Sequence, residues 1–134
     1  MEPTDYAEDV VVPRLSFGVE NLSEVRLTVQ VAAEHCGLAA EAVARFVQAV
    51  SEALANAIRH GGSDRWFLIR KSAHRLRAEV HDSGNSKALI VPEQTPSPDQ
   101  LNGRGLWLMS QLADRLEFKT TGGTTVGIEA RLRS

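Results

Sequence analysis

The sequence reads AEAVARFVQAVSEALANAIR from residue 40 to residue 59, and this stretch has the most regular apolar pattern in the chain. Its large apolar residues fall on one stripe of a helix that turns by about 100° per residue. They are Val43, Phe46, Val47, Val50, Leu54 and Ile58. Glu52 and Asn56 are four residues apart on roughly the opposite face, so their side chains are neighbours. The stretch predicts an amphipathic helix that ends at Gly61-Gly62.

The residues before this helix predict a strand and a second helix. Residues 10–17 are typical of a strand, and Pro13, which has no amide proton to donate, favours the edge of a sheet. Asn21 and Glu24 have the spacing of a capping box, which predicts the start of a helix. This helix is expected to stop at Gly37.

The residues after the central helix predict four more strands and one short helix. The expected strands are 65–71, 76–82, 115–120 and 124–133, and the expected helix is 104–113. The complete order is β-α-α-β-β-loop-α-β-β. This order predicts an α+β fold, a two-layer α/β sandwich with a mainly antiparallel mixed sheet and helices on one face.

Length and composition limit the possible classes of protein. A chain of 134 residues is expected to form one domain, 1–134, and its net charge of −2 argues against direct binding to nucleic acid. It contains no apolar run of the roughly 18 residues that a membrane span requires. The N-terminus is acidic and lacks the apolar core of a signal peptide, so a cytoplasmic location is expected. Cys36 is the only cysteine, which excludes an intramolecular disulfide.

Asp82 is the first candidate binding residue. In the strand 76–82 its carboxylate falls on the same face as the apolar residues Leu76, Ala78 and Val80. A carboxylate aimed at the core needs a hydrogen-bond donor, and the exocyclic amine of adenine is one such donor. The alternative is a strand-end aspartate that forms a turn with Ser83-Gly84.

Thr124 is the second candidate binding residue. It alternates with Val126, Ile128 and Ala130, so its hydroxyl also falls on the apolar face of its strand. Two polar groups from separate strands are thus expected to meet under the helices. The alternative is that Thr124 is simply a good strand former after a glycine turn.

Gly103-Arg104-Gly105-Leu106 precedes a predicted helix and is a candidate phosphate site. Backbone amides at a helix N-terminus donate hydrogen bonds to phosphate oxygens, and glycine permits the close approach of the phosphate. The segment is neither a Walker loop, because no Gly-Lys-Ser/Thr follows, nor a Rossmann fingerprint, because it does not follow a strand. The alternative is a flexible hinge.

Glu52 and Asn56 are candidates for catalysis and metal binding. An asparagine oxygen suits Mg²⁺, which prefers a few protein oxygens together with water and phosphate. A neighbouring glutamate can take a proton from an attacking alcohol. The alternative is an ordinary solvated helix face.

Together, in this order, these segments resemble the GHKL ATPase superfamily, and most closely its bacterial anti-sigma-factor serine kinases. The resemblance extends from about residue 10 to residue 132 and implies the Bergerat ATP-binding fold. It also implies a role for each candidate residue. Glu52 is the implied catalytic base, Asn56 the Mg²⁺ ligand, and the implied ATP contacts are Asn56, Asp82, Gly84, Gly103, Arg104, Gly105, Leu106 and Thr124.

The same resemblance implies an ATP lid over residues 85–102, and residues 1–9 are expected to be a flexible tail. Many superfamily members carry a second glycine two residues after Gly84, where this chain has Ser86. The length leaves no room for the phosphoacceptor domain of a sensor histidine kinase.

The function implied is that of an anti-sigma factor and ATP- and Mg²⁺-dependent protein serine kinase. Its implied partners are a sigma factor, which it sequesters, and an anti-anti-sigma (STAS-type) protein, which it phosphorylates on serine. A homodimer is implied as well, without contact to nucleic acid or membrane. Arg14, Glu24 and Arg26 are candidates for a partner surface. The alternatives are an ATP-binding regulatory module without kinase activity and a scaffold that binds no nucleotide.

Overall fold

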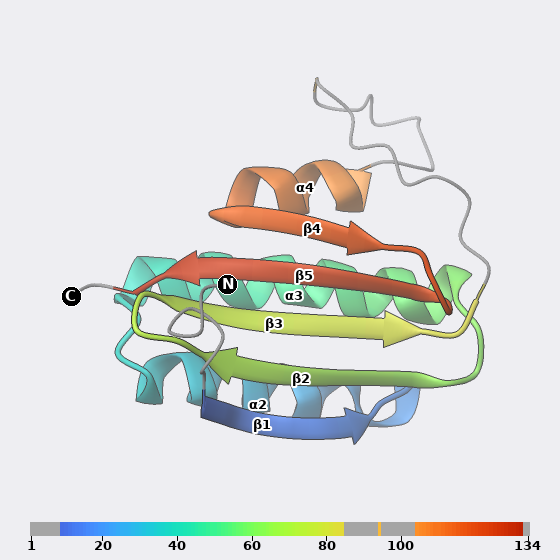
Figure 1. Ribbon diagram of the computed structural model, residues 1–134, viewed down its shortest axis with the longest axis horizontal. Helices are drawn as coiled ribbons and strands as arrows, with labels where there is room; N and C mark the ends of the chain where they lie inside the picture. Colours follow the sequence, from blue (N-terminus) through green and yellow to red (C-terminus); the bar gives the residue numbers. More distant parts are fainter. Residues whose placement is uncertain (1–8, 85–93, 95–103, 133–134) are drawn as a thin grey trace.

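A computed structural model describes residues 9–84, 94 and 104–132. The elements are β1 (Asp9–Ser16), a 3-10 turn η1 (Val19–Asn21), α2 (Leu22–His35), α3 (Ala40–His60), β2 (Arg65–Lys71), β3 (Arg75–Asp82), α4 (Arg104–Leu112), β4 (Arg115–Lys119) and β5 (Thr124–Arg131). The strands form one sheet in the order β1-β2-β3-β5-β4; in Figure 1, α2 and α3 lie behind this sheet and α4 is seen above β4. The predicted α+β two-layer fold is confirmed. All four strand pairings are antiparallel, so the sheet is not mixed.

The core lies between the sheet and the helices. In β3 every second residue from Leu76 to Asp82 is buried, as the alternation predicts. α3 buries Phe46, Val50 and Leu54 of the predicted stripe. Its buried surface is wider than that stripe, because the small residues Ala49, Ala53 and Ala57 are buried too.

The N-terminal elements confirm one expectation and correct another. β1 is an edge strand, and its register with β2 shifts between Val12 and Leu15, on either side of Pro13. The predicted Asn21–Glu24 capping box is wrong, because the side chain of Asn21 caps no amide of α2. A 3-10 turn precedes the helix, and Asn21 Oδ1 instead accepts a hydrogen bond from the Gly18 amide at 2.8 Å.

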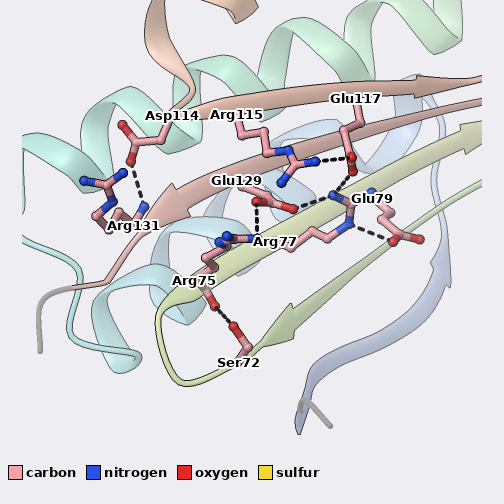
Figure 2. Close-up of polar contacts among 9 residues, drawn as sticks. All are labelled: Ser72, Arg75, Arg77, Glu79, Asp114, Arg115, Glu117, Glu129 and Arg131. Atoms are coloured by element: carbon pink, nitrogen blue, oxygen red, sulfur yellow. Dashed lines mark hydrogen bonds and ion pairs between the residues drawn. The ribbon is translucent and has the colours of Figure 1, made fainter. Parts of the chain in front are cut away.

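The open face of the sheet carries an ion network centred on Arg77 (Figure 2). Arg77 Nη1 lies 2.7 Å from Glu129 Oε2 and 2.6 Å from Glu117 Oε1, and its Nε lies 3.0 Å from Glu79 Oε2. The guanidinium reaches β4 by lying across Gly127 of β5, where a Cβ atom would be 2.6 Å from Arg77 Cζ. The network therefore ties β3, β5 and β4 together.

Glu117 makes the stability of this network dependent on pH. Burial alone raises the pKa of Glu117, but the hydrogen bond and charge of Arg77, with help from Arg115, lower it below its usual value. A carboxylate with a lowered folded-state pKa stabilises the protein above its unfolded-state pKa, and this contribution is lost as the pH falls through the folded-state value.

We therefore expect the unfolding free energy of the wild type to fall more steeply below pH 5 than that of Glu117→Gln. Urea unfolding between pH 7 and pH 3 measures this difference. Asp9→Asn, at an exposed position on β1, is the control and should follow the wild type. Identical slopes for the wild type and Glu117→Gln would contradict the expectation.

Candidate functional site

The structure brings Asp82 and Thr124 together. They are partners in the register of β3 and β5, and both side chains are on the helix side of the sheet. Asp82 is only 8% exposed and Thr124 only 6%. The expectation that these two polar groups meet beneath the helices is confirmed by this register.

Asp82 and Thr124 carry buried polar groups that can form further hydrogen bonds. Asp82 Oδ1 accepts a hydrogen bond from the Gly84 amide at 2.8 Å, so the aspartate turn considered as an alternative is formed. Thr124 Oγ1 is buried and has no hydrogen-bond partner within the described part of the chain. An unpaired buried hydroxyl is costly. A carboxylate beside such a hydroxyl fits a flat ligand with a polar edge, and adenine is one.

Four glycines let the backbone close around Asp82. A Cβ atom on Gly61 would lie 2.6 Å from Asp82 Oδ1, and one on Gly84 would lie 2.7 Å from the amide nitrogen of Gly62. Gly123 has φ +104°, and a Cβ atom there would meet the Asp82 carbonyl oxygen. Side chains at these positions would therefore push the chain away from the Asp82 carboxylate or its strand.

Gly61 and Gly62 are the site residues that sequence reasoning missed, since it treated them only as the end of a helix. Gly61 has φ −92°, which any residue adopts, so its conformation does not require glycine. The close approach of the Asp82 side chain to Gly61 is what requires glycine at this position. The sequence feature that could have indicated this role is the pair of adjacent glycines, because a helix end needs only one glycine.

Glu52 and Asn56 lie against the first turn of α4. A Cβ atom on Gly105 would be 3.1 Å from Glu52 Oε1 and 3.4 Å from Asn56 Oδ1. Both side chains are half-buried, so this is not the fully solvated helix face considered as the alternative. The structure therefore unites the predicted catalytic pair with the start of the predicted phosphate-binding helix.

α3 connects the two groups of residues. Its C-cap Gly61 contacts Asp82, and Glu52 is nine residues earlier, a distance of about 13 Å at a helical rise of 1.5 Å per residue. Asn56 lies between them. Along α3, the Asp82 contact at Gly61 is thus followed by Asn56 and then by Glu52, both of which lie against Gly105.

Other predicted site residues have different surroundings or lie outside the described residues. Arg104 begins α4 and is exposed, whereas Leu106 is half-buried and packs against the core. Gly103 lies outside the described residues, as does the predicted lid at 85–102 apart from Gln94. Of the expected tail, Asp9 already belongs to β1.

The described residues contain no group of three or more His, Cys, Asp or Glu side chains that could hold a metal ion. Mg²⁺ does not need such a cluster, because it commonly binds through one or two protein oxygens, substrate phosphates and water. The Asn56 amide beside Glu52 fits that donor set.

None of the described helices is long and apolar enough to cross a membrane.

The fold and site agree with a family match. Residues 15–129 match the model of the histidine kinase-like ATPase domain, so the chain belongs to that family. Within the family, it is similar to two proteins named serine-protein kinase RsbW. One, from Bacillus pumilus (strain SAFR-032), is 29% identical, and the other, from Bacillus velezensis (strain DSM 23117), is 31% identical. Each alignment covers 90% of this chain and 84% of the relative.

Solved structures show the same fold. The chain aligns with a crystal structure of the RsbU and RsbW domains of a Mycobacterium tuberculosis protein, with a TM-score of 0.65 and 22% identity. This match covers 91% of the chain and 33% of that protein. The histidine kinase domain of a blue-light-activated kinase from Erythrobacter litoralis aligns over 84% of the chain and 60% of its own length, with a TM-score of 0.50 and 25% identity. The family resemblance inferred from the sequence is confirmed.

Proposed function

We propose that this chain is a cytoplasmic protein serine kinase that uses ATP and Mg²⁺ and also acts as an anti-sigma factor. It sequesters a sigma factor and phosphorylates a serine of an anti-anti-sigma protein of the STAS type. The similarity to the two RsbW kinases supports this reaction. The observation that carries the proposal is the placement of Glu52 and Asn56 beside α4, on the same helix whose end contacts Asp82.

At the adenine end, the proposal assigns base recognition to β3 and β5. Asp82 accepts a hydrogen bond from the exocyclic amine, and the unpaired hydroxyl of Thr124 acquires a partner on the base. Gly84 lets the plane of the base approach the backbone. Burial strengthens both hydrogen bonds, because little water competes with the base.

At the phosphate end, the proposal assigns three tasks. Asn56 provides an oxygen ligand to Mg²⁺, which when bound neutralises charge on the phosphates. The segment 103–106 binds phosphate oxygens through backbone amides at the start of α4. Glu52 accepts the proton of the attacking serine hydroxyl and holds that hydroxyl in line.

The proposal also includes a homodimer formed through the edge of β1 and its neighbours. The exposed large apolar residues of the described chain all belong to β1, η1 and α2; they are Val10, Leu15, Val19, Leu27 and Val31. β1 is an edge strand, whose free backbone groups can pair with another strand. A monomer in sedimentation equilibrium at high protein concentration would exclude this part of the proposal.

The second candidate is a regulatory module that binds ATP without transferring phosphate. The half-buried Glu52 favours the kinase, since binding alone does not require a carboxylate beside the phosphate-binding helix. Both candidates require a nucleotide site.

A thermal melt of the wild type with and without Mg-ATP tests that shared requirement. A ligand at 100 times its dissociation constant stabilises the native state by about 2.7 kcal/mol, so the midpoint should rise by several degrees. CTP at equal concentration is the control and should raise the midpoint less. An unchanged midpoint at millimolar Mg-ATP would exclude both candidates and leave a scaffold that binds no nucleotide.

A further inference from the structure

A polar cross-strand pair lies directly behind the proposed adenine site. His81 and Thr125 are register partners on β3 and β5, one position before Asp82 and one after Thr124. Successive side chains of a strand point to opposite faces, so this pair is on the open face of the sheet. His81 Nδ1 and Thr125 Oγ1 are 2.8 Å apart and share a hydrogen bond.

The pair is the end of a row that crosses four strands. The Trp66 ring on β2 stacks on the His81 ring, with centroids 4.8 Å apart and planes at 15°. Arg14 on β1 follows, with its Cζ 3.9 Å from the centroid of the Trp66 ring. Arg14 thus lies on the open sheet face, whereas Glu24 and Arg26, the other candidates for a partner surface, lie on α2.

The position of the row matters because Asp82 and Thr124 form the last rung of the β3–β5 ladder. The turn before Thr124 contains Gly122 and Gly123, both with positive φ, and glycine-rich turns resist deformation least. The ends of strands fray more readily than their centres. Within the ladder, the rung of His81 and Thr125 is the one that adjoins the Asp82–Thr124 rung.

His81 also contacts the turn itself. A Cβ atom on Gly123 would lie 3.1 Å from His81 Cε1, so the imidazole ring packs against the residue that precedes Thr124. Trp66 restricts this ring from the other side by stacking on it. The His81 ring on β3 thus contacts both sequence neighbours of Thr124: it shares a hydrogen bond with Thr125 and packs closely against Gly123.

We propose that His81 and Thr125 are positioning residues for nucleotide recognition: their hydrogen bond on the open face fixes the spacing of Asp82 and Thr124, which bind the base on the helix side. This inference rests on the proposed ATP site. It implies that an event on the open face, without contact to the nucleotide, changes the affinity for adenine. Removing the hydroxyl group of Thr125 should therefore reveal this change in adenine affinity.

Two substitutions at Thr125 separate positioning from general stability. Thr125→Val keeps the β-branched shape and removes the hydroxyl, whereas Thr125→Ser keeps the hydroxyl and removes a methyl group. We expect Thr125→Val to weaken ADP and ATP binding by the same factor, about 3- to 10-fold, because a single hydrogen bond is involved. Thr125→Ser should retain affinity within about twofold of the wild type.

His81→Phe tests the other side of the hydrogen bond. Phenylalanine can still stack on Trp66 but cannot bond Thr125, so it should match Thr125→Val, and the double variant should be no weaker than either single one. Affinities are measured by isothermal titration calorimetry at a temperature where circular dichroism shows every variant folded. Arg115→Lys, on the same sheet face in the Arg77 network, is the control for unspecific effects on the sheet.

The ratio of ATP to GTP affinity provides a readout that lower stability alone would not change. Thr125→Val should reduce this ratio, because a displaced Asp82–Thr124 pair discriminates less between a base with an exocyclic amine and one with a carbonyl at the same position. If the wild type binds ATP and Thr125→Val has the same affinity and ratio, the positioning role is excluded while the proposed function stands. Equal losses of nucleotide affinity in Thr125→Val and Thr125→Ser would also exclude the positioning role. A wild type that binds no nucleotide would exclude the proposed site itself.

Discussion

Replacing Glu52 by glutamine is expected to lower the rate of phosphoryl transfer to the partner serine by about 10²- to 10⁴-fold. Glutamine has nearly the same shape, but its amide cannot accept the proton of the serine hydroxyl. Nucleotide affinity should change by less than about threefold, since the proposal gives Glu52 no contact with the base. Single-turnover transfer of labelled phosphate and calorimetric titration of ATP measure the two effects separately.

The same helix offers a matched control for this substitution. Glu41 is in the first turn of α3, and its side chain is exposed. Glu41→Gln should transfer phosphate at the rate of the wild type. If Glu52→Gln also kept that rate, Glu52 would not be the base, whatever else the chain does. If it lost nucleotide binding as well, its role would be to build the site.

Replacing Asp82 by asparagine is expected to weaken ATP and ADP binding by about 10- to 100-fold, which corresponds to the loss of a hydrogen bond to a charged acceptor. A carboxylate can accept hydrogen bonds at both oxygens, whereas asparagine places an NH₂ group at one of them. One donor, either the Gly84 amide or the adenine amine, then faces another donor.

Asp114→Asn is the control for Asp82→Asn, because Asp114 Oδ2 accepts a hydrogen bond from the amide of Arg131, which is at the opposite end of β5 from Thr124. It should bind nucleotide as the wild type does. Titration calorimetry gives the affinities, and circular dichroism confirms that each variant is folded. If Asp82→Asn bound nucleotide with the affinity of the wild type, the Asp82 carboxylate would not be part of the nucleotide site. The burial of Asp82 would then be explained only by its turn with Gly84.

The strands and the central helix could be predicted from the sequence because their burial follows a simple period. The alternation that places Asp82 among Leu76, Ala78 and Val80 is a local property, and the structure confirms it. That Asp82 lies directly opposite Thr124 is not local, since it depends on the register between strands more than 40 residues apart in the chain. The sequence therefore predicted the two candidates, their shared face and their meeting beneath the helices, whereas the exact register that pairs them is seen only in the structure.

The features that sequence reasoning missed depend on contacts between distant elements. Gly61 and Gly62 read locally as a helix end, because the approach of Asp82 to Gly61 and of Ser83 to Gly62 is visible only in three dimensions. The half-burial of Glu52 depends on α4, which is about 50 residues further along the chain. Asn21 was misassigned because both a capping box and a 3-10 turn use an asparagine at a chain reversal, and local sequence does not choose between them.

The central claim, transfer of phosphate from ATP to a protein serine, is tested most directly by incubating the wild type with Mg²⁺, γ-labelled ATP and each STAS-type protein of the same organism. Mass spectrometry then identifies any phosphorylated residue. The account predicts one phosphoserine on one of these proteins, dependent on Mg²⁺ and on Glu52. Bound ATP without labelled serine on any of them would contradict the kinase and leave the regulatory module as the function of this site.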